Sequence, residues 1–189
     1  HADGCVFQTH DAMEYFGRKV SKHSSIIENP MILNNKNQDI IKAVDRDKRV
    51  VCVARYDPQK NHTMMIRAFS RFHKKHTDYV LEIYGRDFNY QSTMEGMIRE
   101  LRMEKFIRIM GPQHNLHDKI YSASINVLPS NWEGMPNALL EAVALGVPSI
   151  ATDCPIGGSR QIIEDGINGY LIPVGDEDAL VDRMNKLAD

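Results

Sequence analysis

The chain has 189 residues, a formal net charge of −2 and a hydrophobic fraction of 42%. This length suits one domain, or one domain with a short additional segment, and the composition is that of an ordinary soluble globular protein. The small net charge gives no reason to expect nucleic acid or an anionic membrane as a partner. No apolar run is long enough to cross a bilayer, and no signal peptide is visible.

The cysteines and histidines give no sign of a metal site. Cys5, Cys52 and Cys154 have no metal-like spacing and cannot all pair, so we expect a reduced, cytoplasmic setting. The eight histidines are scattered and predict no metal ligand. The chain opens at His1 without a methionine, so we expect a piece of a longer protein. Association of that full-length protein with the cytoplasmic face of a membrane is left open.

The first part of the chain mixes polar and apolar residues in a helix-like way around Asp11–Lys19. A short apolar step and a turn signal follow at Ile26–Pro30. Because Asn34–Asp47 is polar and poorly patterned, we place a domain boundary there, which divides the chain into residues 1–40 and 41–189. The alternative is that the first residues form a hairpin or loose arm of the same domain.

From Arg49 onward, strand-like runs alternate with helix-like runs. The predicted strands are Val50–Ala54, Tyr79–Tyr84, Phe106–Met110, Ile125–Leu128, Pro148–Ala151 and Tyr170–Ile172. The predicted helices are Asn61–Lys74, Met94–Leu101, His117–Ala123, Ala138–Leu145, Gly158–Ile163 and Asp178–Leu187. Such alternation implies parallel strands joined by right-handed crossovers. We therefore predict an α/β fold with a Rossmann-like doubly wound parallel sheet and ligands at the carboxyl ends of its strands.

The segment Pro129–Glu141 connects a predicted strand to a predicted helix. Pro136 suits a first helical turn, and Gly134 has no side chain to block a ligand. A helix start has free N–H groups and a partial positive charge, which attract phosphate. The carboxylates of Glu133 and Glu141 flank this start and can accept hydrogen bonds from sugar hydroxyls. A phosphate joined to sugars, that is a nucleotide-sugar, is the ligand that this pattern favours.

Two cations, Arg55 and Lys60, follow the first strand of the repeat, where a dinucleotide enzyme would carry a glycine-rich turn. An arginine fork and a lysine point charge are the usual partners of a diphosphate. In a group transfer they would also neutralise the departing diphosphate. The alternative is an exposed pair of charges on a loop.

The same stretches carry a family resemblance, which covers most of the chain from about Lys48 to Asp189. They resemble the donor-binding domain of the retaining GT-B glycosyltransferases called family 4, or group 1. The matching stretches are Glu133–Asn137 with Glu141-Ala142, Ala144–Pro148, Thr152–Gly158, Asp165–Pro173, and Val53–Arg55 with Lys60.

The resemblance implies roles for individual residues. Arg55 and Lys60 would hold the donor phosphates, Glu133 would contact the donor sugar, and Glu141 would bind the ribose hydroxyls. We expect the catalytic residues to be Arg55, Lys60 and Glu133. Further donor-binding residues are expected at two strand ends and at the helix start: Gly85, Arg86, Ile109, Met110, Gly134, Met135, Asn137 and Ala138. Of these, Ile109 and Met110 end a strand that, together with the following loop, would lie against the base and bond it through backbone atoms. The alternative for Ile109 is core packing.

The resemblance also implies a reaction. A retaining glycosyltransferase would move a sugar from a UDP-hexose or UDP-N-acetylhexosamine to an acceptor hydroxyl, in bacterial polysaccharide synthesis, without a metal or other cofactor. An acceptor glycan or lipid-linked sugar would bind through a missing N-terminal domain, of which residues 1–40 would be a remnant with the linker. The fragment alone should be inactive. The alternatives are a GT-B-like nucleotide-sugar epimerase and a non-catalytic binding module.

Overall fold

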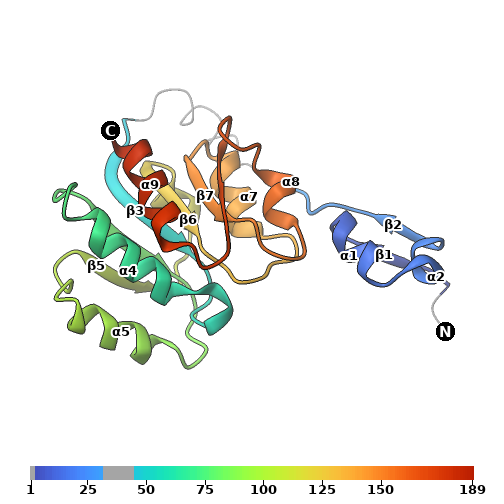
Figure 1. Ribbon diagram of the computed structural model, residues 1–189, viewed down its shortest axis with the longest axis horizontal. Helices are drawn as coiled ribbons and strands as arrows, with labels where there is room; N and C mark the ends of the chain where they lie inside the picture. Colours follow the sequence, from blue (N-terminus) through green and yellow to red (C-terminus); the bar gives the residue numbers. More distant parts are fainter. Residues whose placement is uncertain (1–2, 32–44) are drawn as a thin grey trace.

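The computed structural model describes residues 3–31 and 45–189. Residues 3–31 form a small unit in which two short parallel strands pair with each other and are connected by two short helices (Figure 1). Its elements are β1 (Cys5–Phe7), α1 (His10–Tyr15), α2 (Arg18–Ser21) and β2 (Ser24–Ile26). The predicted helical stretch is divided because Gly17, at φ +74°, interrupts it. The predicted boundary in Asn34–Asp47 lies mostly outside the described residues.

The rest of the described chain is built on one parallel sheet with the strand order β5-β4-β3-β6-β7-β8. All five of its strand pairings are parallel, which confirms the predicted doubly wound sheet. The strands are β3 (Asp47–Val53), β4 (Val80–Tyr84), β5 (Ile107–Gly111), β6 (Ala123–Leu128), β7 (Ser149–Thr152) and β8 (Gly169–Ile172).

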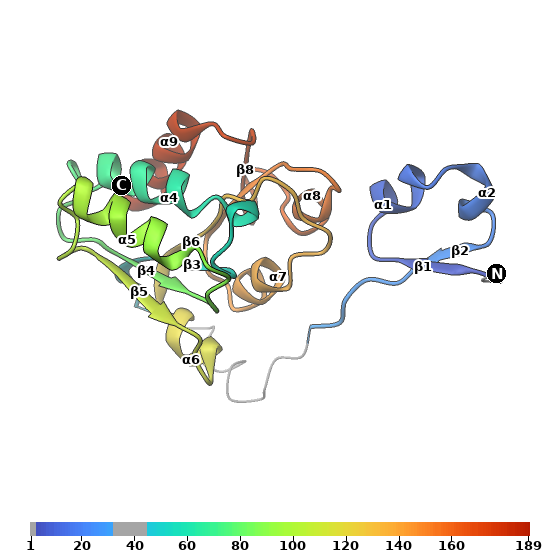
Figure 2. The same ribbon diagram turned by 90° about the horizontal axis from the view of Figure 1, so that it is seen from below.

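Helices cover both faces of this sheet (Figure 2). One face is covered by α4 (His62–Phe72), α5 (Gln91–Glu100) and α9 (Glu177–Ala188). The other carries α6 (Leu116–Ile120) and α7 (Asn137–Ala144), and α8 (Gly158–Ile162) packs beside α7. Every helix and strand predicted after Arg49 is present, with ends shifted by up to three residues.

The strands are apolar on both sides because both faces of the sheet are buried. In β3, Val50 and Cys52 enter the core beneath α4 and α5, whereas Val51 packs with Ile120 and Ala142 on the opposite face. This two-sided burial explains why the strands appear in the sequence as short continuous apolar runs.

The chain order of the strands reverses between β3 and β6, which are neighbours in the sheet although β4 and β5 separate them in sequence. On one side of this point the chain continues outward to β4 and β5, and on the other side to β7 and β8. The connections therefore diverge at the carboxyl ends of β3 and β6, and a crevice opens between them. None of the helices in the described residues is both long and apolar enough to cross a membrane.

Candidate functional site

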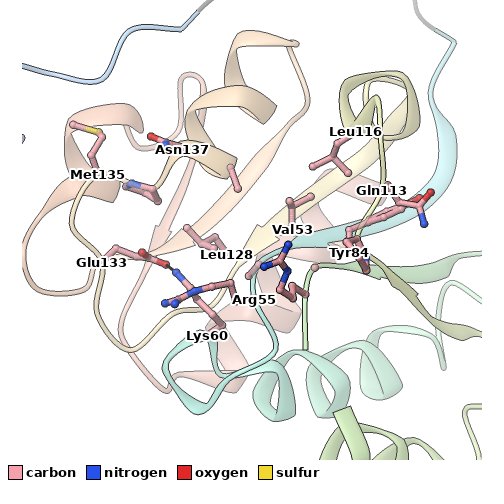
Figure 3. Close-up of a pocket in the computed structure, with 16 residues that line it drawn as sticks. Val53, Arg55, Lys60, Tyr84, Gln113, Leu116, Leu128, Glu133, Met135 and Asn137 are labelled. Carbon is pink, nitrogen blue, oxygen red and sulfur yellow. Dashed lines mark hydrogen bonds and ion pairs between the residues drawn. The ribbon is translucent and has the colours of Figure 1, made fainter. Parts of the chain in front are cut away.

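A cavity of about 510 Å³ lies at the carboxyl ends of β3 and β6, where the strand order reverses. Its polar end is formed by Arg55, Lys60 and Glu133, which lie close together in Figure 3. The opposite end carries Leu116 and Gln113 (Figure 3). The three polar side chains come from two loops far apart in sequence. The sheet order is therefore what assembles the polar end.

Lys60 and Glu133 form an almost buried ion pair. The Lys60 Nζ lies 2.5 Å from Glu133 Oε1, and the two side chains are only 12% and 7% exposed. The Ser130 hydroxyl donates to the same carboxylate oxygen at 2.6 Å, and the Thr152 hydroxyl donates to the Ser130 carbonyl at 2.5 Å. The carboxylate is thus held on one side by Ser130, which Thr152 of β7 anchors, and on the other by the loop that carries Lys60.

Arg55 is the more exposed of the two cations, with 51% of its side chain accessible to solvent. Its guanidinium lies 3.4 Å from Asp57 Oδ2, donates to Gln59 Oε1 at 3.3 Å, and stands 5.1 Å from the centroid of the Phe88 ring. These contacts leave the guanidinium at the rim of the cavity. Arg55 and Lys60 thus bring two positive charges to the polar end, each of them beside one carboxylate, Asp57 and Glu133 respectively.

The loop that carries both cations is fastened to the core by His62. The Nε2 of this buried ring lies 2.9 Å from the Arg55 carbonyl, and its Nδ1 lies 3.7 Å from Cys52 Sγ. A carbonyl can only accept, so Nε2 carries the proton and Nδ1 accepts from the thiol. Burial lowers the pKa of His62, which keeps the ring neutral. Burial also raises the pKa of Cys52 to about 12, so this thiol is no nucleophile.

The amino end of α7 points its free N–H groups at the cavity, which Met135, Asn137 and Ala138 help to line. The N–H groups of Leu139 and Leu140 donate to the Pro136 carbonyl. Within the described chain, this leaves the N–H groups of Asn137 and Ala138 without an acceptor inside the helix. Pro136 precedes the helix and does not occupy its first turn. The helix tip therefore offers a partial positive charge to an anion.

Close packing of α8 holds the loop before this tip in place. A Cβ atom on Gly158 would lie 1.6 Å from the Gly134 carbonyl oxygen and 2.8 Å from the Pro136 ring. Only glycine permits so close an approach of two backbones. Gly134 itself does not line the cavity. A Cβ atom at this position would point toward the N-terminal unit and lie 3.9 Å from Gln8 Oε1.

The apolar end of the cavity is formed by side chains such as Val53, Tyr84, Leu116 and Leu128. The Tyr84 hydroxyl donates to Glu82 Oε2 at 2.7 Å, which fixes the orientation of the ring. Arg49 pairs with the same carboxylate oxygen at 2.7 Å. Burial together with this carboxylate raises the pKa of the Tyr84 phenol well above its ordinary value, so the hydroxyl stays a donor.

The remaining expected donor-binding residues differ in their placement. Gly85 and Arg86 line the cavity, but Ile109 and Met110 do not. Side chains of successive strand residues point to opposite faces, and these two pack into the two core layers on either side of the sheet. The residues that reach the cavity from this strand are Pro112 and Gln113, which lie just beyond its end.

Glu141 does not line this cavity either. It lies 3.4 Å from His117 and lines a neighbouring hollow together with Gln8 and Asn29 of the N-terminal unit. The α7 geometry explains this placement, because a residue four positions after Asn137 lies about one turn, or ~5.4 Å, further along the helix axis. Asn137 lines both hollows, so Glu141 is adjacent to the main cavity but outside it.

Several residues of this site were missing from the sequence-based prediction, notably Ser130, Thr152, His62 and Gln59. Buried polar residues next to predicted strand ends were the available signal for Ser130 and Thr152, but their partners are set by long-range packing. No group of three or more potential metal-ligating side chains was found among residues 3–31 and 45–189.

Comparison with known families identifies the chain. The family model described as Glycosyl transferases group 1 matches residues 34–189, which is most of the sequence. The chain belongs to the group 1 glycosyltransferases. This confirms the group 1 membership inferred from Glu133–Asn137 and the neighbouring stretches.

Curated relatives of this group 1 glycosyltransferase chain include two bacterial proteins. It is 32% identical over 141 residues to an exopolysaccharide phosphotransferase of Streptomyces coelicolor, covering 74% of this chain and 15% of that protein. It is 27% identical over 169 residues to the N-acetylgalactosamine-N,N'-diacetylbacillosaminyl-diphospho-undecaprenol 4-alpha-N-acetylgalactosaminyltransferase of Campylobacter jejuni, covering 89% of this chain and 45% of that protein. The chain thus spans less than half the length of either relative.

Solved structures share the fold. A TarM variant of S. aureus, in complex with fondaparinux, alpha-GlcNAc-glycerol and UDP, superposes with a TM-score of 0.86 at 23% identity, over 98% of this chain and 36% of that chain. The pneumococcal O-GlcNAc transferase GtfA, in complex with UDP and GlcNAc, superposes with a TM-score of 0.83 at 23% identity, over 99% and 38%. With the observed sheet order, they confirm the predicted Rossmann-like half of a GT-B fold.

Proposed function

We propose that this chain is the donor-binding part of a glycosyltransferase that moves a sugar from a UDP-sugar to an acceptor hydroxyl during bacterial polysaccharide synthesis. The observation that carries the proposal is the shared cavity of Arg55, Lys60 and the amino end of α7 at the point where the strand order reverses. Two cations and a helix tip facing one space suit a diphosphate, which carries its negative charge over several oxygens.

The rest of the cavity suits the other parts of a nucleotide-sugar. The apolar surface near Val53, Tyr84 and Leu116 would take the nucleoside, and Glu133 would accept hydrogen bonds from hydroxyls of the sugar. The relatives and solved structures named above support this arrangement, since two of the structures contain UDP and one relative is an N-acetylgalactosaminyltransferase. A UDP-hexose or UDP-N-acetylhexosamine is therefore the donor that we favour.

In the proposed reaction, the bond between the anomeric carbon and the diphosphate oxygen breaks, and its electron pair leaves with UDP. The acceptor oxygen bonds to the anomeric carbon and loses its proton. Arg55, Lys60 and the α7 tip would stabilise the charge that develops on the departing diphosphate, in the role that a divalent metal plays elsewhere. Retention of the anomeric configuration, and transfer without a metal, are part of this proposal by family resemblance.

Because the chain spans less than half the length of its relatives, acceptor binding and transfer by the whole protein are also proposals. We propose that residues 1–40 belong to the acceptor-side domain and its linker. In the described part, this N-terminal unit contacts the rest through Thr9, whose hydroxyl donates to the Ile156 carbonyl at 3.0 Å, and through Asp11, which lies 3.3 Å from Arg160. The chain alone should bind donor weakly and transfer little or nothing.

Calorimetric titration of the chain with UDP, GDP, ADP and uridine tests the donor site. We expect UDP to bind more tightly than uridine. Arg55→Ala should weaken UDP binding by about tenfold or more, from the loss of a charge-assisted hydrogen bond, and leave uridine binding unchanged. Arg55 is half exposed, so this variant should fold normally. Lys60→Ala should likewise weaken UDP far more than uridine, and an equal loss for both would refute the phosphate role.

Two outcomes would favour the alternatives. A non-catalytic module that has lost the site should bind none of the four ligands. An epimerase would, as the full-length protein, convert the sugar of the nucleotide-sugar without transferring it to an acceptor, which product analysis by NMR would reveal. Transfer to an acceptor glycan by the full-length protein supports the proposal directly.

A further inference from the structure

Two loops that are about 70 residues apart in sequence lie side by side at the polar end of the cavity. We call them the cation loop (Arg55–Asn61) and the carboxylate loop (Ser130–Glu133). Besides the Lys60–Glu133 ion pair, four hydrogen bonds join them. In one of these, the Asn61 side-chain amide donates to Asn131 Oδ1 at 3.3 Å. The Asn131 N–H donates to the Gln59 carbonyl at 2.8 Å, and the Asn131 side-chain amide donates to the Pro58 carbonyl at 3.1 Å.

The fourth bond comes from the Gln59 side chain, whose amide makes a hydrogen bond through both its nitrogen and its oxygen. Its Nε2 donates to the Trp132 carbonyl at 2.7 Å, while its Oε1 accepts from the Arg55 guanidinium at 3.3 Å. A carbonyl can only accept and a guanidinium can only donate, so the orientation of this amide is fixed by its partners. One side chain therefore connects Arg55 of the cation loop with the residue directly before Glu133.

Arg55 depends on such support because its long side chain is half exposed. An unrestrained arginine loses about 2 kcal/mol of rotamer entropy when it is fixed by a ligand. Asp57 and Phe88 restrain the guanidinium from within the cation loop and from the loop after β4. Gln59 adds a further restraint, because it links the Arg55 guanidinium by hydrogen bonds to the Trp132 carbonyl in the carboxylate loop.

We propose that Gln59 is a positioning residue, which sets the place of Arg55 relative to the carboxylate loop and so prepares the polar end of the cavity for a diphosphate. This inference rests on the proposed function, because the distance between Arg55 and the carboxylate loop matters for binding a diphosphate. Gln59 is not itself assigned to contact the ligand. Its effect on binding should therefore act through Arg55.

The first experiment measures this dependence as a double-mutant cycle on the 189-residue chain. Gln59→Leu removes both side-chain hydrogen bonds without adding a charge, and should weaken UDP binding about three- to tenfold while leaving uridine binding unchanged. In the Arg55→Ala background the same substitution should have almost no further effect. Gln91→Leu is the matched control, because Gln91 makes a comparable amide hydrogen bond to Glu95 in α5, away from the cavity.

The second experiment needs no ligand. Trp132 is the chain's single tryptophan, and its ring is 52% exposed, so its fluorescence anisotropy reports the mobility of the carboxylate loop. Gln59→Leu should lower the Trp132 anisotropy, whereas Arg55→Ala and Gln91→Leu should leave it at the wild-type value.

The proposal is overturned if Gln59→Leu leaves the anisotropy unchanged, or if it weakens UDP binding equally in the presence and absence of Arg55. Parallel losses of UDP binding, uridine binding and thermal stability would also overturn it, because they would indicate a general structural role. Failure of the proposed function gives a different result, because the wild-type chain would then bind no UDP. The anisotropy measurement would still test the link between Gln59 and the carboxylate loop.

Discussion

Removing one member of the buried ion pair of Lys60 and Glu133 should strongly lower the free energy of unfolding. Methionine is uncharged but similar in length to lysine. In Lys60→Met, the Glu133 carboxylate, whose side chain is 7% exposed, keeps only the Ser130 hydroxyl among the side-chain partners found in the described residues. Removing one member of a buried pair costs about 3–5 kcal/mol. Because this pair borders an open cavity that admits water, we expect the lower end of that range, about 3 kcal/mol.

The double variant Lys60→Met with Glu133→Gln should recover most of this loss. It contains no orphaned charge, and the new amide can still accept from the Ser130 hydroxyl. Its stability should fall within about 1 kcal/mol of wild type, since an ion pair taken out of a protein interior as a whole is often nearly neutral. The coupling energy between the two positions would then be about 2 kcal/mol or more, well above that of an exposed pair.

Urea unfolding followed by circular dichroism measures all four proteins of this cycle under one set of conditions. A loss of about 3 kcal/mol should also lower the melting temperature by about 6–12 °C for a chain of this size. The reasoning is refuted if the double variant is as unstable as Lys60→Met alone, or if Lys60→Met costs less than about 1 kcal/mol, the value of a surface pair.

Three other predictions follow from buried contacts of the same site. Ser130→Ala should lower the free energy of unfolding by about 1–2 kcal/mol, because the Glu133 carboxylate loses a donor, and an unchanged urea midpoint would contradict this. Gly158→Ala should destabilise the chain and weaken UDP binding, because the new Cβ would meet the Gly134 carbonyl oxygen. The control is Gly96→Ala in α5, whose Cβ meets nothing within 4 Å and which should stabilise the chain by about 0.5–1 kcal/mol. Equal effects of the two substitutions on the melting temperature would be inconsistent with this packing. His62 has a folded-state pKa below its ordinary value, so the unfolded chain takes up the proton first as pH falls below about 6.5. Stability should therefore decrease toward acid pH by up to ~1.4 kcal/mol per pH unit for this group. His62→Gln should remove that part of the slope in urea titrations carried out at successive pH values below about 6.5.

The sequence was informative about the elements and their order. Continuous apolar runs such as Val50–Ala54 predict strands buried on both faces, and the alternation with amphipathic helices predicts a parallel sheet. Arg55 and Lys60 follow the first of these strands, and the loop before α7 follows the fourth. In a parallel sheet all carboxyl strand ends lie on one edge, so local pattern alone was enough to place these groups at the same edge.

The sequence was less informative about residues whose direction depends on side-chain geometry. We expected the strand end at Ile109 and Met110, with the loop that follows, to meet the base through backbone atoms. The two side chains pack into core layers, and Pro112 and Gln113 of that loop line the cavity. Glu141 lines the hollow next to the cavity and lies 3.4 Å from His117, and its contact with ribose hydroxyls stays a prediction. These placements depend on the face from which each side chain leaves its strand or helix.

By itself, then, the sequence determined the class of fold, the helix tip and the charges available at the edge of the sheet, because these follow from local periodicity and residue chemistry. Only the tertiary structure decided which of these groups meet. The pairing of β3 with β6 brings Lys60 to Glu133 across 73 residues, and Gln59, Ser130 and Thr152 then hold both loops in place. Such contacts depend on strand order and packing, which no local pattern encodes.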